Sequence, residues 1–444
     1  MYKIDLSGIS NTYEYEELIK VFLKPTEYCI MESHNEPALE KNEAKRRLYR
    51  SLSEWTGKEY DWGILTGVRP VKLVGGLYEK FRNEESLVKN ALMQEYLLSA
   101  EKAALLIAIY QYQQEILPKP AGRQVGVYIG IPFCPTRCLY CSFTSNQAPD
   151  SKIREYMEAL YREIEFVGRE MKSANMKPET VYIGGGTPTT LDAAQLALLF
   201  AHIQNSFDLS ELKEYTVEAG RPDTITSDKL KAIQEVGVSR ISINPQSMQD
   251  KTLQLIGRGH TSQDIQDAFS AAREINSGII NMDIIAGLPE ESAEDFLDTM
   301  QQLVKLGPEN ITVHTLAVKR ASKLIDINKE YHYEQGETVS EMLRSASELL
   351  TREGYVPYYL YRQKHMAGNL ENIGWCKRGT AGIYNIRIME EMQTIIALGA
   401  GGITKVYYPD ENRLERVPNV TNYELYTSRI DEMIQRKKEH LFAP

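Results

Sequence analysis

From residue 125 onward the sequence alternates short strand-like runs with amphipathic helical stretches, and this alternation limits the fold more than any other feature. Runs rich in β-branched and aromatic residues are typical of strands, and apolar residues at helical spacing are typical of helices. The candidate strands begin near Val125, Thr180, Tyr215, Ser239, Ile279 and Ile311. The helical stretches between them cover residues 152–171, 193–205, 227–236, 262–276 and 293–306. Repeated β-α units predict parallel strands joined by right-handed crossovers, so the expected fold class is α/β.

Three of the five cysteines lie together, directly after the apolar run 125–131, in the spacing C-x3-C-x2-C. They are Cys134, Cys138 and Cys141. Thiols this close together indicate a metal site rather than a disulfide framework. Structural zinc normally takes four protein ligands, whereas a [4Fe-4S] cluster held by three thiolates leaves one iron open to a small molecule. A zinc site completed from afar by Cys376, Cys29 or a histidine is an alternative, and so is a chance group of buried thiols.

Charge and composition exclude several classes of protein. The 444 residues include 51 Lys and Arg against 61 Asp and Glu, a net charge of −10, which argues against non-specific binding to nucleic acid or anionic membranes. No apolar run approaches the roughly 20 residues that span a bilayer, and the first five residues lack a signal-peptide pattern. Five cysteines in this length fit a reducing compartment. We therefore expect a cytoplasmic protein without a membrane span or a nucleic-acid partner.

The other candidate strands also end in polar or glycine-rich residues. Gly184-Gly-Gly-Thr-Pro188 follows the second strand, Glu218 lies in the third, and Asn244-Pro-Gln246 follows the fourth. Asp283 lies in the fifth strand, and the sixth ends near Ala317. Reactive groups of α/β barrels come from loops at the carboxyl ends of the strands, so these residues should meet on one face. A buried carboxylate such as Glu218 also needs a partner, either a bound ligand or a neighbouring arginine.

The cysteine spacing, with Tyr128, Ile131-Pro-Phe133 and Tyr140 around it, resembles the cluster-binding loop of the radical S-adenosylmethionine (radical SAM) superfamily. The flanking residues are similar to those of the oxygen-independent coproporphyrinogen III dehydrogenases, and within that family to the HemZ-like branch. The resemblance covers residues 125–325 and extends weakly to about residue 405. It implies a [4Fe-4S] cluster, one or two molecules of S-adenosyl-L-methionine (SAM), and a partial (β/α)6 barrel in place of a closed barrel of eight units.

The resemblance also implies roles for particular residues. The three cysteines would ligate the cluster. Contacts to the SAM molecule on the cluster are matched by Tyr128, Gly185 and Glu218. Contacts to a second SAM molecule are matched by Tyr140, Gly186, Thr187, Gln246, Arg258, Asp283 and Ala317. No residue is assigned to the chemistry of the substrate itself.

The chain is long enough for two or three domains. Residues 1–120 form an expected N-terminal α/β accessory domain, with strands at 4–6 and 27–32 and helices at 13–23, 41–56, 71–81 and 95–116. A Pro-rich linker, 117–124, leads into the partial barrel, 121–325. Residues 326–444 form an expected α+β extension that covers the substrate, with a helix at 340–353, a strand at 355–361 and a helix from residue 423.

Several positions depart from the family pattern. The dehydrogenases have a histidine where this chain has Gly130, and a fourth cysteine where it has Phe143. Related heme chaperones also have phenylalanine at the latter position, but they carry a His-Asn pair where this chain has Gly368-Asn369. The residues alone therefore leave both an enzyme and a chaperone open.

The activity implied by the resemblance is the radical SAM oxidative decarboxylation of coproporphyrinogen III to protoporphyrinogen IX, a step of anaerobic heme biosynthesis. One alternative is a heme-binding or trafficking chaperone without dehydrogenase turnover. Another is a radical SAM enzyme that acts on a different tetrapyrrole. The expected partners are a tetrapyrrole substrate and a reductant such as flavodoxin or ferredoxin.

A substrate with four propionates needs cations in its pocket. The candidate cations are Arg221, His260, Lys319, Arg320 and Lys364, each with ordinary surface charge as the alternative. Tyr359 and Tyr361 are candidates for packing on the macrocycle, with plain core packing as the alternative.

Overall fold

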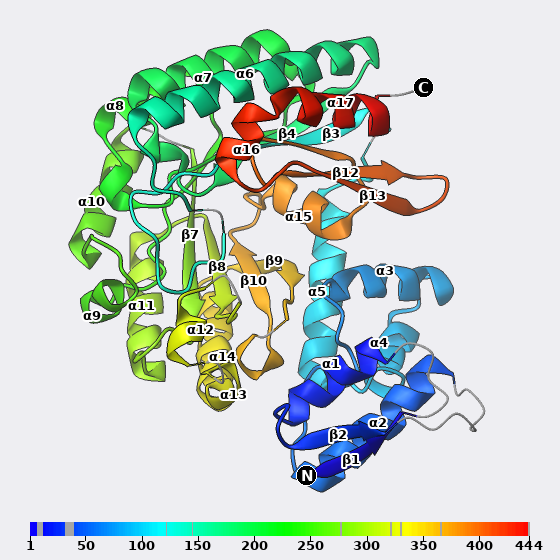
Figure 1. Cartoon of the computed structure of the whole chain (residues 1–444). Coiled ribbons are helices and arrows are strands. Elements are labelled where there is room, and N and C mark those ends of the chain that lie inside the picture. The colour runs from blue at the N-terminus through cyan, green and yellow to red at the C-terminus, as the bar shows by residue number, and fades with distance from the viewer. Residues whose placement is uncertain are drawn as a thin grey trace.

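The computed structural model describes residues 1–6, 12–31, 40–120, 122–143, 145–275, 278–319, 322–328, 331–364 and 366–442. Within these residues the chain forms a small two-stranded sheet and a large eleven-stranded sheet, whose order is β13-β12-β11-β3-β4-β5-β6-β7-β8-β10-β9 (Figure 1). The large sheet is mostly parallel, and it carries the candidate site.

The centre of the large sheet is a run of six parallel strands, which confirms the alternating pattern of the sequence. The strands are β3 (Gln124–Ile131), β4 (Lys177–Gly185), β5 (Glu214–Glu218), β6 (Arg240–Ser242), β7 (Ile279–Ala286) and β8 (Asn310–Thr315). The connecting helices are α6 (Asp150–Ser173), α7 (Ala193–Ser206), α8 (Ser227–Glu235), α9 (Asp250–Leu255), α10 (Ser262–Glu274) and α11 (Ala293–Leu306). Short 3-10 helices are η1 (Pro188–Thr190), η2 (Leu209–Glu211) and η3 (Pro222–Thr224). The longer helices cover the outer face of the curved sheet (Figure 1). Of the α-helices α6 to α11, the sequence analysis predicted all except α9.

Burial and capping explain why these residues form strands and helices. Strands of a parallel sheet that is covered by helices are buried on both faces, and the apolar residues of β3, β4 and β5 are almost all buried. Helices α7, α10 and α11 begin with capping boxes at Asp192, Thr261 and Ser292, which satisfy helix N–H groups that would otherwise lack a partner. Local signals and tertiary burial therefore agree.

Both edges of the parallel run are extended by strands from the C-terminal part of the chain. On one side β11 (Ile395–Leu398) pairs parallel with β3, and β12 (Ile403–Tyr408) and β13 (Arg413–Pro418) follow in antiparallel order. On the other side β10 (Asn372–Cys376) pairs antiparallel with β8, and β9 (Val356–Tyr361) pairs antiparallel with β10. Within the described residues β13 and β9 are separate ends of the sheet. The barrel is therefore partial, as expected, and β11 adds one parallel strand that the sequence did not predict.

The N-terminal part of the chain lies beside the barrel (Figure 1). Its elements are β1 (Tyr2–Asp5), α1 (Tyr13–Phe22), β2 (Tyr28–Met31), α2 (Lys41–Thr56), α3 (Pro70–Lys80), α4 (Glu85–Gln94) and α5 (Ala100–Ile116). The first of these elements, from β1 to α2, have a small core of their own, whereas α3, α4 and α5 share the main core with the barrel. The two strands pair in parallel, so the α/β character agrees with the prediction. The helix predicted at 95–116 begins only at Ala100, because the Ser99 hydroxyl caps it by accepting a hydrogen bond from the N–H of Lys102.

A buried polar cluster fastens this N-terminal unit to the large sheet. The indole Nε1 of Trp62 donates to Glu371 Oε2 at 2.7 Å, and Lys102 Nζ donates to Glu371 Oε1 at 2.6 Å. The Arg362 guanidinium lies over the Trp62 ring, 4.7 Å from its centroid. Buried charges are tolerated when they are paired, so the cluster specifies how the unit sits on the sheet. We keep 1–120, 121–325 and 326–444 as proposed domains, although the large sheet takes strands from the last two.

The remaining helices belong to the C-terminal part of the chain. They are α12 (Leu324–Ile327), α13 (Tyr331–Glu334), α14 (Gly336–Arg352), η4 (Ala367–Asn369), α15 (Ile383–Glu390), α16 (Tyr423–Ser428) and α17 (Ile430–His440). Helix α14 and strand β9 confirm the elements predicted at 340–353 and 355–361. Helix α14 packs on α11, and α16 and α17 pack on α6. Among the helices that the structure describes, none combines the length and apolar character that a membrane crossing requires.

Candidate functional site

A cavity of about 500 Å³, the barrel cavity, lies inside the curved sheet, bounded by strands β3 to β10 and by helix α15. Every residue that the sequence analysis assigned to the cluster or to SAM lines it: Tyr128, Cys134, Cys138, Tyr140, Cys141, Gly185, Gly186, Thr187, Glu218, Gln246, Arg258, Asp283 and Ala317. Groups from separate strands therefore meet in one place. Their individual roles as ligands stay predictions.

The cysteine loop is held in position by hydrogen bonds to distant parts of the chain. The N–H of Cys134 donates to the carbonyl of Asn146 at 3.0 Å, which closes the base of the loop. The N–H of Leu139 donates to the carbonyl of Ile256 at 2.9 Å, and the Ser322 hydroxyl donates to the Leu139 carbonyl at 3.0 Å. A binding loop that is fixed before its ligand arrives loses less entropy on binding.

The donor set suits an iron-sulfur cluster better than zinc. Cys134, Cys138 and Cys141 are unbridged thiols that line the same cavity, while Cys29 and Cys376 lie elsewhere, in β2 and β10. Neither Cys29 nor Cys376 can be the fourth ligand of a structural zinc site on the three cysteines. Three thiolates are enough to hold a cubane with one open iron. Burial raises the pKa of the Cys134 thiol to about 11, so iron binding must displace a proton.

The glycine-rich turn after β4 lies directly against the cysteine loop. Gly185 has a positive φ of 118°, and the N–H of Gly186 donates to the Ile131 carbonyl at 2.8 Å. A Cβ atom on Gly186 would lie 2.5 Å from the Phe133 carbonyl oxygen and 3.0 Å from Cys134 Sγ. Only glycine fits there, and the backbone of the turn therefore lies directly against the cysteine loop.

The Glu218 carboxylate is bound by the turn and by a neighbouring tyrosine. The Tyr182 hydroxyl donates to Glu218 Oε1 at 2.5 Å, and the N–H of Gly185 donates to Oε2 at 3.3 Å. Burial raises the pKa of Glu218 to about 7, although the Tyr182 hydrogen bond favours the ionised form. The carboxylate therefore titrates near neutral pH, next to the expected SAM site.

Three stacked tyrosines form the wall next to Glu218. The Tyr182 ring stacks on Tyr384 of α15, with centroids 4.4 Å apart, and on Tyr128 of β3, with centroids 6.1 Å apart. Tyr128 and Tyr182 are direct register partners on β3 and β4. The sequence analysis gave Tyr182 no role, although strand alternation places it on the same face as Gly184 and so offered a signal.

Arg258 holds the opposite wall together. Its guanidinium donates to the Asn244 carbonyl and, at 3.3 Å, to the Tyr140 hydroxyl. Its Nε is buried without a hydrogen-bond partner among the described residues. Gln246 has a positive φ of 68°, which is uncommon for a residue with a side chain, and its N–H donates to the Asp283 carbonyl at 2.9 Å. These groups leave polar atoms available to a ligand.

Asp283 is not isolated in its strand, because a histidine that the sequence analysis did not select faces it. His314 Nε2 lies 3.6 Å from Asp283 Oδ2, and Asn281 Nδ2 donates to Asp283 Oδ1 at 2.7 Å. The Tyr361 hydroxyl lies 3.2 Å from His314 Nδ1. Burial alone would raise the pKa of Asp283, but His314 and Asn281 outweigh it and hold the pKa below its usual value.

Two candidate substrate cations are occupied by a carboxylate. Arg221 lines the barrel cavity, but its Nε and Nη2 donate to Asp223 at 2.9 and 2.7 Å. His260 lies 3.5 Å from the same Asp223 and does not line the barrel cavity. Arg240 is likewise paired with a carboxylate, Glu214, at 3.4 Å. The neighbouring arginine that was an alternative partner for Glu218 is therefore neither Arg221 nor Arg240.

The other candidates for substrate binding are divided between two places. Lys319, Tyr359 and Tyr361 line the barrel cavity. Lys364 instead pairs with Glu17 at 3.5 Å and lines a different cavity. Arg320 lies outside the described residues.

Comparisons with known proteins decide the family. The chain matches the Radical SAM superfamily over residues 128–303. It is 39% identical over 395 residues, which are 88% of this chain and 79% of the relative, to the oxygen-independent coproporphyrinogen-III oxidase-like protein HemZ of Bacillus subtilis (strain 168). The chain belongs to the HemZ family of radical SAM proteins. Membership of this superfamily implies a [4Fe-4S] cluster and SAM, in agreement with the donor set of the barrel cavity.

Two further comparisons of this HemZ-family chain show weaker similarity. The heme chaperone HemW of Bacillus subtilis (strain 168) is 36% identical over 193 residues, which are 43% of this chain and 50% of HemW. Among solved structures, the radical SAM enzyme coproporphyrinogen III oxidase (HemN) from Escherichia coli has a TM-score of 0.55 at 21% identity over 73% of each chain. At that identity the likeness concerns the fold alone.

Proposed function

We propose that this HemZ-family protein is an oxygen-independent coproporphyrinogen III dehydrogenase that acts in the cytoplasm. Such an enzyme decarboxylates two propionates of coproporphyrinogen III to vinyl groups and forms protoporphyrinogen IX. The observation that supports this most is that the three cysteines, the glycine turn and Glu218 line one cavity inside the barrel.

The cysteine loop would hold a [4Fe-4S] cluster, which together with SAM would supply one-electron radical chemistry. At each propionate, one hydrogen atom leaves the carbon next to the pyrrole. Release of CO2 and transfer of one electron to an acceptor then leave a vinyl group. The reductant of the cluster is a low-potential protein such as flavodoxin or ferredoxin.

The residues of the chain bind the cluster, SAM and the substrate, orient them, and exclude water from the site. In this proposal Cys134, Cys138 and Cys141 hold three irons, and the backbone of Gly185 contacts the amino group of SAM. Glu218 accepts hydrogen bonds from the ribose or attracts the sulfonium, and Tyr182 keeps its carboxylate in place. The residues expected to bind a second SAM molecule, Arg258 and Asp283 among them, form the opposite wall.

A heme-binding chaperone is the second candidate, because the HemW relative is 36% identical over 193 residues. A chaperone of this kind needs an axial ligand for the heme iron. At the position of the chaperones' histidine this chain has Gly368, which adopts a left-handed conformation in η4 and offers no ligand. This difference favours the enzyme.

The test is anaerobic reconstitution of the purified protein with iron and sulfide, followed by SAM, dithionite and coproporphyrinogen III. We expect about four irons per chain, SAM-dependent deoxyadenosine, and mono- and divinyl products in mass spectrometry. Samples without SAM should give no deoxyadenosine and no vinyl product. Zinc in place of iron would contradict the cluster assignment. Tight heme binding without vinyl product would favour the chaperone, and a methylated or linear tetrapyrrole would favour a different radical SAM enzyme.

A further inference from the structure

The cations that line the barrel cavity differ in what neutralises them. Among the described residues they are Arg221, Arg240, Arg258, His314 and Lys319. The first two pair with Asp223 and Glu214, and the imidazole of His314 faces Asp283. The Arg258 guanidinium donates to two oxygen atoms of the protein. Lys319 is the one of these five residues for which the structure gives, among the residues it describes, neither a carboxylate partner nor a hydrogen bond to a protein oxygen atom.

Lys319 is half-buried just beyond the end of β8, and within the described chain no carboxylate lies within ion-pair distance of its ammonium group. Its ammonium group lies 5.8 Å from the centroid of the Phe143 ring, and the neighbouring Cys141 thiol is the group that favours its charged form. A cation withdrawn from water without a carboxylate partner costs free energy. Lys319 can therefore take an anionic ligand beside the cysteine loop.

Phe143 is the other half of this feature. It belongs to the cysteine loop, two residues after Cys141, yet 68% of its surface is exposed. An exposed aromatic ring beside an ammonium group suits a ligand that is apolar on one side and anionic on the other. We call the two residues the Phe143–Lys319 lip. Both line the barrel cavity, on the side of the cluster loop.

We propose that the Phe143–Lys319 lip recognises the substrate, with the Lys319 ammonium binding a propionate carboxylate and the Phe143 ring packing on the pyrrole that carries it. This inference rests on the proposed function and names the group that would select a carboxylate-bearing tetrapyrrole. In a propionate the carboxylate carbon is two bonds from the carbon that loses hydrogen. A cation next to the cysteine loop therefore holds that carbon near the source of the radical.

The test is the affinity of the reconstituted protein for coproporphyrin III, a fluorescent oxidised form of the substrate, and for its tetramethyl ester. Lys319→Met removes the charge at nearly constant length. We expect it to weaken coproporphyrin III binding about tenfold or more, since a charge-assisted hydrogen bond is lost, and to leave the ester unaffected. Lys319→Arg should restore most of the affinity. The control is Lys323→Met, because Lys323 is exposed and lies outside the barrel cavity.

Iron content and the SAM dissociation constant are measured on every variant and should not change. Equal binding of coproporphyrin III by wild type and Lys319→Met would overturn the inference. So would a variant whose only defect is reduction by flavodoxin, which would make Lys319 a docking residue, or one that loses iron, which would make it a cluster residue.

Failure of the inference and failure of the proposed function can be told apart. If wild type and Lys319→Met form vinyl product with equal kcat/KM, the proposed reaction stands and recognition by the Phe143–Lys319 lip is rejected. If coproporphyrin III binding depends on Lys319 but no vinyl product forms, recognition by the lip stands and the proposed reaction is rejected. Wild-type protein that binds no coproporphyrin III would reject both.

Discussion

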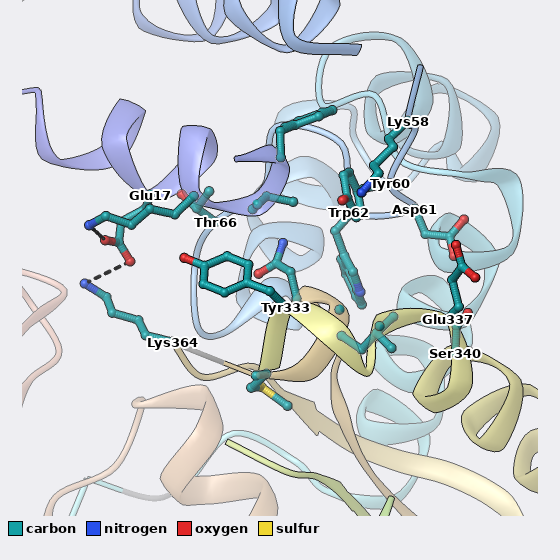
Figure 2. Close-up of a pocket in the computed structure, with 18 of the residues that line it drawn as sticks. Glu17, Lys58, Tyr60, Asp61, Trp62, Thr66, Tyr333, Glu337, Ser340 and Lys364 are labelled. Atoms are coloured by element: carbon teal, nitrogen blue, oxygen red, sulfur yellow. Dashed lines mark hydrogen bonds and ion pairs between the residues drawn. The ribbon is translucent and has the colours of Figure 1, made fainter. Parts of the chain in front are cut away.

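Two cavities of similar size lie in the described part of the molecule, and only one of them contains the predicted cluster and SAM residues. The interdomain cavity, of about 620 Å³, lies between the N-terminal unit and helices α13 and α14. Its lining includes Glu17, Tyr60, Asp61, Trp62, Tyr333, Glu337 and Lys364 (Figure 2). The barrel cavity is smaller, at about 500 Å³. Size alone therefore does not distinguish the two cavities.

The two cavities differ in how far the protein satisfies its own polar groups. In the interdomain cavity Lys364 pairs with Glu17 (Figure 2). Lys20 pairs with the same carboxylate, and the Trp62 indole donates to Glu371, which lies outside the cavity lining. In the barrel cavity Arg258 Nε and Asn244 Oδ1 are buried without a partner among the described residues. Native proteins rarely leave such atoms unsatisfied, so they indicate where a ligand belongs.

The largest effect should come from a cysteine of the barrel cavity. Cys138→Ser should abolish iron loading beyond background and with it all SAM-dependent deoxyadenosine, because one iron loses its thiolate. Iron analysis and mass spectrometry measure both. The matched control is Cys29→Ser, a cysteine of β2 outside both cavities. Loss of iron in the control, or its retention in Cys138→Ser, would break the distinction between the two regions.

The next effect concerns stability at the interdomain cavity. Trp62 is 1% exposed, and its truncation in Trp62→Ala should lower the free energy of unfolding by about 3–5 kcal/mol. Trp55→Ala is the control, since Trp55 is 45% exposed and its loss should cost under about 1 kcal/mol. Urea titration measures both. SAM affinity per folded molecule should not change. A large loss of SAM affinity would mean that the interdomain cavity contributes to binding after all.

A smaller effect separates two carboxylates, one in each cavity. Glu218→Gln should weaken SAM binding about tenfold to a hundredfold, since a hydrogen bond to a charged group is lost. Glu337→Gln in the interdomain cavity should have no effect. The pKa of Glu218 is about 7, so its carboxylate form grows as pH rises through 7. Wild-type SAM affinity should therefore rise between pH 6 and 8, while that of Glu218→Gln should stay flat in calorimetric titration.

The smallest effect concerns a buried carboxyl that lines neither cavity. Burial raises the pKa of Glu291 to about 7, although the Ser247 hydroxyl donates to it. The folded state therefore holds its proton more tightly than the unfolded state does. Its stabilising contribution is complete below pH 4.5 and is lost as pH rises through 7. Glu291→Gln should gain about 1–3 kcal/mol at pH 8 relative to wild type. Urea titrations at pH 5 and 8 measure the free energy of unfolding. An equal change between the two pH values in wild type and Glu291→Gln would contradict this prediction.

Much of the fold could be predicted because its signals are local. Each strand and helix between residues 125 and 315 carries its own periodicity, and the caps at Asp192, Thr261 and Ser292 lie next to the helices they start. The glycine turn, Glu218 and Asp283 stood out because each interrupts an apolar strand. A rule about where parallel strands end was then enough to bring them together.

What could not be predicted depends on which strands become neighbours. Tyr182 reads as an ordinary strand aromatic until β4 and β5 pair and bring its hydroxyl to Glu218. His314 faces Asp283 only because β7 and β8 are adjacent. The Trp62–Glu371 bond joins residues from opposite ends of the chain. No local pattern encodes such pairs.

Strand β3, which leads into the cysteine loop, has β4 on one side and β11 on the other. Strand β11 is formed by Ile395–Leu398, far along the chain from β3. A ribosome working at about 5–20 residues per second therefore releases β11 roughly 10–60 s after β3. During that interval β3 presents an open edge that invites wrong pairing. Iron loading of a correctly built barrel must therefore follow translation, and a chain cut before residue 395 would hold its cysteines on an unfinished support.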